Sequence, residues 1–254
     1  MSFFSLLLLA ALLPSSARSE HVDMGIINGT EAKPHSRPYM VSVQRKGNHI
    51  CGGFLVSEHF VMTAAHCWNQ EDKLTVVLGA HELPKSSSDL GRKAVKFYHI
   101  HPMYDSETLF NDLMLLQLNK TAKKSQRINW IPIPTKDKDI KAKPACSVAG
   151  WGKQQTSGSR SKRLMEVDVS VMDKRFCQKY WGKGYSASRM VCAGGQGGFC
   201  QGDSGGPLVC KGTAVGIVSF TDDKDCNSPN RLPNVYTKIS KFLPWIKAIL
   251  GSME

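Results

Sequence analysis

The chain has 254 residues, 41% hydrophobic and 21% charged, and its 33 Lys and Arg outnumber 21 Asp and Glu by a formal net charge of +12. These proportions are those of globular proteins and exclude a disordered, collagen-like or coiled-coil chain. A chain of this length forms one or two domains with a substantial buried core.

The first element is an apolar run at the N-terminus, Phe3–Leu13. It is too short to cross a bilayer core about 30 Å thick, and the small residues Ala17 and Ser19 follow it. This pattern predicts a secretory signal peptide over residues 1–19, although no Lys or Arg precedes the run. No other segment predicts a membrane span, so we expect a secreted protein.

In a secreted protein, cysteines are expected to form disulfides and Asn-x-Thr motifs can be glycosylated. An even number of cysteines in an oxidising compartment predicts disulfides, and no C-x-x-C pair supports a structural zinc site. Asn28 and Asn119 each begin an Asn-x-Thr sequon. The cysteines allow many pairings, and the residues alone do not choose among them: Cys51, Cys67, Cys146, Cys177, Cys192, Cys200, Cys210 and Cys226.

The rest of the chain predicts β-structure. Short runs rich in β-branched residues are separated by Gly, Pro, Asn and Ser, and they include Tyr39–Gln44, Leu74–Leu78, Glu166–Val171 and Ala214–Phe220. Many short strands at this spacing favour a sandwich or a barrel. One helix is expected near the end, capped by Ser240 and stopped at Gly251, with an apolar face made by Phe242, Trp245, Ile246 and Ile249.

The strongest local motif is the glycine-rich segment Gly202–Pro207 around Ser204. Such a turn lets the backbone approach a substrate, and a serine in it becomes a nucleophile only if a base takes its proton. The alternative is a structural turn with a solvated serine. The G-x-S-x-G elbow of another hydrolase family requires a histidine after the serine, and every histidine here precedes Ser204.

A base and a carboxylate can be chosen from their surroundings. His66 ends an apolar run and adjoins a cysteine, whereas His99 and His101 resemble a metal pair but lack further ligands and are interpreted as surface histidines. Asp112 directly precedes the apolar run Leu113–Leu116, where a buried carboxylate needs a partner. The candidate triad is therefore His66, Asp112 and Ser204.

The motifs TAAHC, NDLMLL and GDSGGP, with IINGTEA near the start and CAGG before the serine, resemble those of the chymotrypsin-like (trypsin-fold) serine peptidases. The resemblance extends from Ile26 to about Leu250, and within the family it is strongest to granule proteases: granzymes, mast-cell proteases and neutrophil elastase. It implies an all-β fold of two six-stranded antiparallel Greek-key barrels with a C-terminal α-helix. The active site would lie in the cleft between the barrels, in one peptidase domain over residues 26–254.

The resemblance also implies roles for these residues. Ser204 attacks the scissile carbonyl, His66 transfers the proton, and Asp112 orients the imidazole, with Ser219 bonded to that carboxylate. The backbone N–H groups of Gly202 and Ser204 form the oxyanion hole. No cofactor or metal is implied, and Ala80 stands where trypsin has its first acidic calcium ligand. The implied disulfides are Cys51–Cys67, Cys146–Cys210, Cys177–Cys192 and Cys200–Cys226.

Activation is implied in the same way. In the family, proteolysis creates an N-terminal ammonium, here on Ile26, that pairs with a buried carboxylate, here Asp203. Residues 20–25 would then be an activation peptide. Gly25 precedes the cut, which disfavours a trypsin-like activator, and six residues are three dipeptides, which suggests a dipeptidyl aminopeptidase.

The expected substrate pocket lacks the acidic base of trypsin-like enzymes, because Gly198 occupies that place. Thr221 replaces a glycine of the open wall, and Asn234 lies near the back. The added bulk favours small or medium aliphatic P1 residues, so we expect an elastase-like preference first, chymase-like second and trypsin-like third. The expected lining residues are Gly198, Phe199, Gln201, Ser219, Phe220, Thr221 and Asn234.

Charge suggests a further partner. Basic residues cluster at Arg92–Lys96, Lys120–Arg127, Lys136–Lys143 and Arg160–Arg163. In a secreted protein these clusters favour heparin or granule proteoglycan over nucleic acid, and the alternative is an ordinary solvated face. The expected function is a secreted endopeptidase of cytolytic granules, made as a zymogen, acting on proteins and peptides and inhibited by serpins. The competing hypothesis is a catalytically weak or dead heparin-binding, antimicrobial protein on the same fold.

Overall fold

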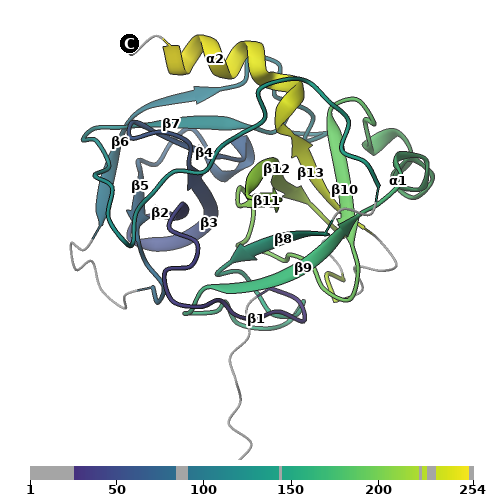
Figure 1. Ribbon diagram of the computed structural model, residues 1–254, viewed down its shortest axis with the longest axis horizontal. Coiled ribbons are helices and arrows are strands. Elements are labelled where there is room, and N and C mark those ends of the chain that lie inside the picture. Colours follow the sequence, from purple (N-terminus) through teal and green to yellow (C-terminus); the bar gives the residue numbers. More distant parts are fainter. Residues whose placement is uncertain (1–25, 84–90, 143–144, 223–224, 228–232, 252–254) are drawn as a thin grey trace, which may run out of the picture.

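The computed structural model describes residues 26–83, 91–142, 145–222, 225–227 and 233–251. The predicted signal peptide and activation peptide lie outside these residues. Within them the chain forms two closed antiparallel β-barrels that lie side by side, as expected (Figure 1).

The first barrel closes in the strand order β2-β3-β4-β7-β6-β5. Its first two strands form a hairpin whose two turn residues, Lys46 and Gly47, have φ of 52° and 81°, the backbone of a type I′ turn. The interior is filled by Val, Leu, Phe and Met side chains at or near zero exposure. The strands are β2 (Met40–Arg45), β3 (Asn48–Leu55), β4 (Phe60–Thr63), β5 (Leu74–Leu78), β6 (Arg92–Ile100) and β7 (Met114–Leu118).

The second barrel follows the same plan. Its strands pair in the order β9-β10-β13-β12-β11-β8, and pairing of β8 with β9 closes the ring, while the short strand β1 (Thr30–Glu31) adds to β9. The β11–β12 turn again has two residues with positive φ, Lys211 and Gly212. The strands are β8 (Ala145–Gly150), β9 (Met165–Val171), β10 (Met190–Gly194), β11 (Pro207–Cys210), β12 (Thr213–Phe220) and β13 (Asn234–Lys238).

Two α-helices accompany the barrels in the part of the chain that the structure describes. The C-terminal helix α2 (Leu243–Gly251) buries Ile246 against the first barrel, as expected. The prediction that Ser240 caps it was wrong, because Ser240 lies in a preceding 3-10 turn, η3 (Ile239–Phe242), and donates a hydrogen bond to Asp137. Helix α1 (Lys174–Trp181), which the sequence analysis did not predict, begins after Asp173, whose side chain accepts from the Arg175 N–H. The remaining 3-10 turns are η1 (Ala65–Cys67) and η2 (Gly182–Gly184).

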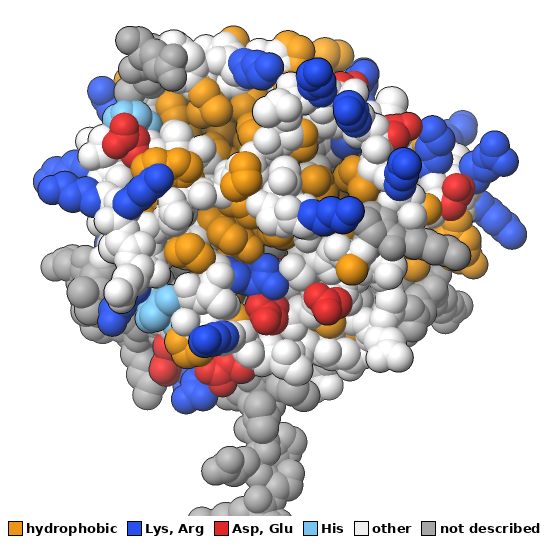
Figure 2. All heavy atoms as spheres, viewed as in Figure 1, with side chains coloured by type: hydrophobic (Ala, Val, Ile, Leu, Met, Phe, Trp, Pro, Cys, Tyr) orange, Lys and Arg blue, Asp and Glu red, His pale blue; other side chains and the backbone are white. Residues whose placement is uncertain are grey.

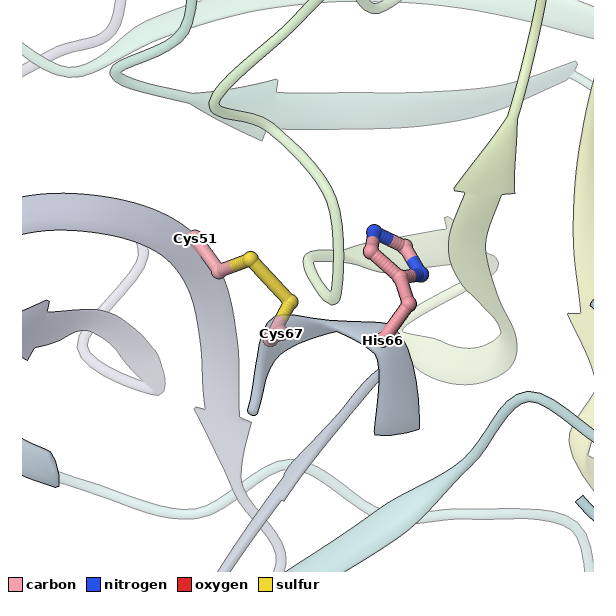
Figure 3. Close-up of side chains that lie close together, drawn as sticks. All are labelled: Cys51, His66 and Cys67. Atoms are coloured by element: carbon pink, nitrogen blue, oxygen red, sulfur yellow. A yellow bond between two sulfur atoms is a disulfide. The ribbon is translucent and has the colours of Figure 1, made fainter. Parts of the chain in front are cut away.

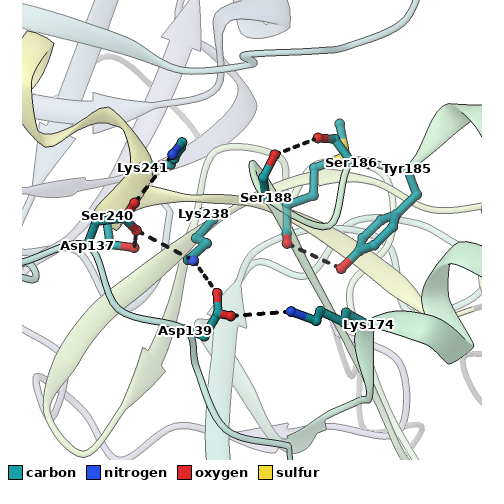
Figure 4. Close-up of polar contacts among 10 residues, drawn as sticks. Asp137, Asp139, Lys174, Tyr185, Ser186, Ser188, Lys238, Ser240 and Lys241 are labelled. Carbon is teal, nitrogen blue, oxygen red and sulfur yellow. Dashed lines mark hydrogen bonds and ion pairs between the residues drawn. The ribbon is translucent and has the colours of Figure 1, made fainter.

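A buried lysine ties the segment between the barrels to the second one (Figure 4). The Lys238 side chain is only 5% exposed, and its Nζ lies 2.7 Å from Asp139 and 3.5 Å from Asp137. The two aspartates neutralise Lys238, and they also pair with Lys174 and Lys241.

The structure contains four disulfides, and they join the same four pairs that the resemblance implies. Both sequon asparagines, Asn28 and Asn119, are exposed. In the described part of the chain, no helix has the length and apolar character needed to cross a bilayer.

Candidate active site

His66 and Asp112 meet at one edge of the first barrel because their strands pair. In the β4–β7 ladder Thr63 lies opposite Met114, so the turn that follows β4 and the residue that precedes β7 are neighbours. Asp112 is fully buried, and its Oδ2 lies 2.7 Å from His66 Nδ1. The His66 backbone N–H donates to Oδ1 at 3.0 Å. An ionised carboxylate only accepts, so Nδ1 carries the hydrogen and Nε2 is the basic nitrogen.

The second barrel holds Asp112 from the other side. The Ser219 hydroxyl on β12 donates to Asp112 Oδ2 at 2.5 Å, and the Thr237 hydroxyl on β13 donates to the Asp112 carbonyl at 2.9 Å. Burial raises the pKa of the neighbouring Tyr104 to about 12, and the Asp112 charge adds to this rise. Asp112 is thus a buried carboxylate that bonds residues of both barrels.

The Ser204 turn lies between the two barrels. The Ser204 carbonyl accepts from the Gly52 N–H on β3 at 2.8 Å and lies 3.8 Å from Cys67 Sγ. On its other side the Gly205 N–H donates to Val218, the residue before Ser219. The Ser204 turn is therefore fixed on both sides. On one side it contacts Cys67, which follows His66, and on the other it bonds Val218, which precedes Ser219.

Gly205 allows this close approach. Its φ is +81°, and a Cβ there would lie 2.1 Å from Thr63 Oγ1, so only glycine fits.

His66 and the Cys51–Cys67 disulfide extend from the same short turn, η1 (Figure 3). Potential ligand atoms of Cys51, His66 and Cys67 lie within 4.8 Å of one another, the only such group of three among the residues described. Both sulfurs are committed to the disulfide, so this group is not a metal site. His99 and His101 are engaged elsewhere: His99 Nε2 bonds Gln117, and the His101 ring packs against Phe242 of η3 and Trp245 of α2.

His49 orients the backbone of the Ser204 turn, a role that sequence reasoning missed. Its Nε2 lies 2.9 Å from the Gly202 carbonyl, and its Nδ1 lies 2.8 Å from Ser42 Oγ. Burial lowers the pKa of His49 to about 4, so the ring is neutral near pH 7, its Nε2–H donates to Gly202 and Nδ1 accepts from Ser42. This bond fixes the peptide that follows Gly202, whose φ is +103°. No local motif marks His49, because its partner is 153 residues away.

Asp203 is a second fully buried carboxylate. The Gly152 and Cys200 N–H groups donate to it at 2.7 and 3.1 Å, and burial raises its pKa to about 7. A Cβ at Gly150 or Gly152 would lie 2.0 or 2.4 Å from atoms of the Asp203 carboxyl group, so these glycines make the space for it.

The chain around Ile26 runs beside the segment that leads to Asp203. Ile26 is fully buried in the core of the second barrel, and Ile27 exchanges two backbone hydrogen bonds with Gly198 at 2.9 and 3.2 Å. Ile26 has φ of +60°, a conformation that β-branched residues rarely adopt. The two residues of the predicted activation pair, Ile26 and Asp203, therefore lie on neighbouring segments.

Several predicted pocket residues are bonded to one another. Asn234 is fully buried, its Oδ1 accepts from the Phe199 N–H at 3.1 Å, and its Nδ2 donates to Thr221 Oγ1 at 2.7 Å. Phe220 packs edge-on against Trp181 of α1. Gly198 pairs with Ile27, Gln201 is exposed, and Ser219 contacts Asp112. The structure thus brings Phe199 and Thr221 each into contact with Asn234.

Comparison with known proteins agrees with this geometry. The family model described as Trypsin matches residues 26–246. The chain is 40% identical to granzyme-like protein 1 of Rattus norvegicus, over 97% of this chain and 98% of that protein. It is 38% identical to human cathepsin G (98% and 95%) and 43% identical to human granzyme H (95% and 96%). The structure of mouse neuropsin, a serine protease, superposes with a TM-score of 0.81 at 33% identity, over 89% of this chain and all of that one.

Proposed function

Because this chain belongs to the trypsin family of serine endopeptidases, we propose that Ser204, His66 and Asp112 form its catalytic triad. The observation that supports this most directly is the buried Asp112 carboxylate, which bonds both the His66 ring and its backbone N–H. These bonds fix the tautomer in which Nε2 is basic and stabilise the imidazolium that forms when Nε2 takes a proton.

In this mechanism Ser204 Oγ attacks the substrate carbonyl as its proton passes to His66 Nε2. The negative oxygen that forms is held by the backbone N–H groups of Gly202 and Ser204. His66 then gives the proton to the leaving amine, which departs and leaves an acyl-enzyme. Water attacks the acyl group with the same help from His66, and Ser204 is regenerated. The His49 bond to the Gly202 carbonyl keeps this part of the backbone fixed throughout.

We further propose that the chain is a zymogen, with a signal peptide over residues 1–19 and an activation peptide over residues 20–25. Cleavage before Ile26 would create an ammonium that pairs with Asp203, and two observations support the pairing. Asp203 is buried with no cationic hydrogen-bond partner among the residues described, and Ile27 is hydrogen-bonded to Gly198 nearby. The ion pair would lower the pKa of Asp203 and hold the oxyanion backbone in place.

The pocket supports a preference for small or medium aliphatic P1 residues, with chymase-like specificity second and trypsin-like third. Gly198 places no carboxylate at the pocket base for Arg or Lys. Asn234 accepts a hydrogen bond from the Phe199 N–H and donates one to Thr221, and these bonds stiffen the opposite wall of the predicted pocket.

Storage in secretory granules and inhibition by serpins fit the relatives, which include granzymes, cathepsin G and mast cell protease 3. Heparin or granule proteoglycan remains the polyanion proposed for the basic clusters.

A fluorophosphonate probe tests the central proposal. The chain that begins at Ile26 should be labelled at Ser204, whereas its Ser204→Ala variant and the uncut precursor should not. A matured chain that folds normally but resists the probe would instead support the catalytically dead binding protein. A peptide library with each P1 residue then tests specificity, and cleavage dominated by P1 Arg or Lys would overturn the proposed order.

A further inference from the structure

Helix α1 presents two aromatic rings to solvent. Phe176 and Tyr180 are 37% and 44% exposed, and their ring centroids lie 4.4 Å apart. They are one helical turn apart and so lie on the same face. Among the residues that the structure describes, only Phe97 and Met103 are comparably exposed large apolar residues. The pair thus forms an exposed apolar patch on α1.

Cations surround this patch. Arg175, Lys179 and Lys183 are exposed, and none of them makes an ion pair with a residue that the structure describes. Lys174, by contrast, is engaged with Asp139 (Figure 4). In Figure 2, basic side chains gather beside apolar ones at the right-hand edge, where Figure 1 places α1. We call Arg175, Phe176, Lys179, Tyr180 and Lys183 the α1 surface.

The α1 surface is held rigidly. Cys177 is fully buried and bonded to Cys192 of β10, and the Asp173 side chain caps the helix. At the other end Trp181 Nε1 donates to the Pro233 carbonyl at 2.9 Å. The two exposed rings are therefore not needed to hold the helix in place. A preformed surface also loses little conformational entropy when it binds.

We propose that the α1 surface binds anionic phospholipid membranes. Lys and Arg side chains are attracted to anionic headgroups, and aromatic rings partition into the interface between headgroups and acyl chains. A sulfated glycan would match the cations but leave both rings in water, so a lipid surface fits the whole patch better. Trp181 packs on Phe220, so a docked helix places this wall of the predicted pocket close to the membrane.

Vesicle sedimentation tests this proposal without proteolysis, because the matured Ser204→Ala chain can be used. It should sediment with vesicles of phosphatidylcholine and phosphatidylserine but not with phosphatidylcholine alone. The double variant Arg175→Gln/Lys179→Gln should bind about 25-fold more weakly, at about five-fold per cation. The double variant Phe176→Ser/Tyr180→Ser should lose binding at physiological salt while it keeps its retention on heparin.

A matched control combines an exposed apolar residue and an exposed cation that lie outside both the α1 surface and the basic clusters, Met103 and Lys33. Met103→Ser/Lys33→Gln should sediment like the parent. Near-ultraviolet circular dichroism checks that each variant is folded. The proposal is overturned if phosphatidylserine does not increase sedimentation of the parent, or if the control loses as much binding as the α1 variants. It is also overturned if only the cation variant loses binding, because that result would indicate a polyanion site instead.

Discussion

Replacing Asp203 by Asn should stabilise the uncut chain in neutral and alkaline solution. In this chain the carboxyl group is fully buried, and burial raises its pKa from 3.8 to about 7. A raised pKa means that the native state binds the proton more tightly than the unfolded state does. The free energy of unfolding therefore decreases as pH rises from about 4 to 7, by about 1.4 kcal/mol per pH unit and on the order of 4 kcal/mol in total.

Asn is neutral at every pH and nearly the same shape, and its amide oxygen can still accept from the Gly152 N–H. Above pH 7 the variant should be more stable than the parent by up to that same amount, which raises the Tm of a chain this long by on the order of 10 °C. At pH 4 the two should unfold together. Thermal unfolding of Ser204→Ala precursors from pH 4 to 8 measures this, with Asp168→Asn, exposed on β9, as the control.

In the chain that begins at Ile26 the sign should reverse. In the proposed mechanism the new ammonium pairs with Asp203, and removing one partner of a buried ion pair costs about 3–5 kcal/mol. Asp203→Asn should therefore destabilise the matured chain and abolish its labelling by a fluorophosphonate. A precursor whose stability is flat or rises between pH 4 and 7, or an Asn variant that stabilises both forms equally, would refute the reasoning.

Three further substitutions probe the site. Ser219→Ala removes a hydrogen bond to the buried charge of Asp112, worth about 1.5–3 kcal/mol, so kcat/KM on a chromogenic peptide should fall roughly 10- to 100-fold; an unchanged value would remove Ser219 from the site. Gly152→Ala places a Cβ 2.4 Å from the buried activation carboxylate and should prevent probe labelling, whereas Gly184→Ala meets open space and should label normally. Thr221→Gly should widen the pocket wall and shift P1 preference in a peptide library toward larger residues; an unaltered profile would contradict the predicted lining.

The sequence predicted the parts of the site that have local signals. The apolar run after Asp112 marked a buried carboxylate, and the order of the histidines relative to Ser204 excluded another hydrolase family. The structure brings His66 and Asp112 into contact because β4 and β7 pair in register, a fact that strand patterns alone do not reveal. The barrel arrangement came from the resemblance, since alternation of apolar residues fits a sandwich as well.

Other features could not be predicted because their causes are non-local. Helix α1 is short, and its position depends on the Cys177 disulfide and the contacts of Trp181, so no periodic apolar stripe marks it. His49 depends on Ser42 across a hairpin and on Gly202 in the other barrel. Ser240 fits a cap by residue type, but a hydrogen bond to Asp137 holds it in a different turn.

The backbone of Ile26 has a consequence for the direction of maturation. A β-branched residue with φ of +60° is strained by about 1–2 kcal/mol, because its Cβ crowds the adjoining backbone. Hydrolysis of the bond before Ile26 removes the carbonyl carbon that defines this torsion, and the strain disappears with it. Religation would have to rebuild the strained torsion and pull a charged amine back out of the interior. If the chain matures by the proposed cut, that cut would be hard to reverse, and the activated form would not readily return to the precursor.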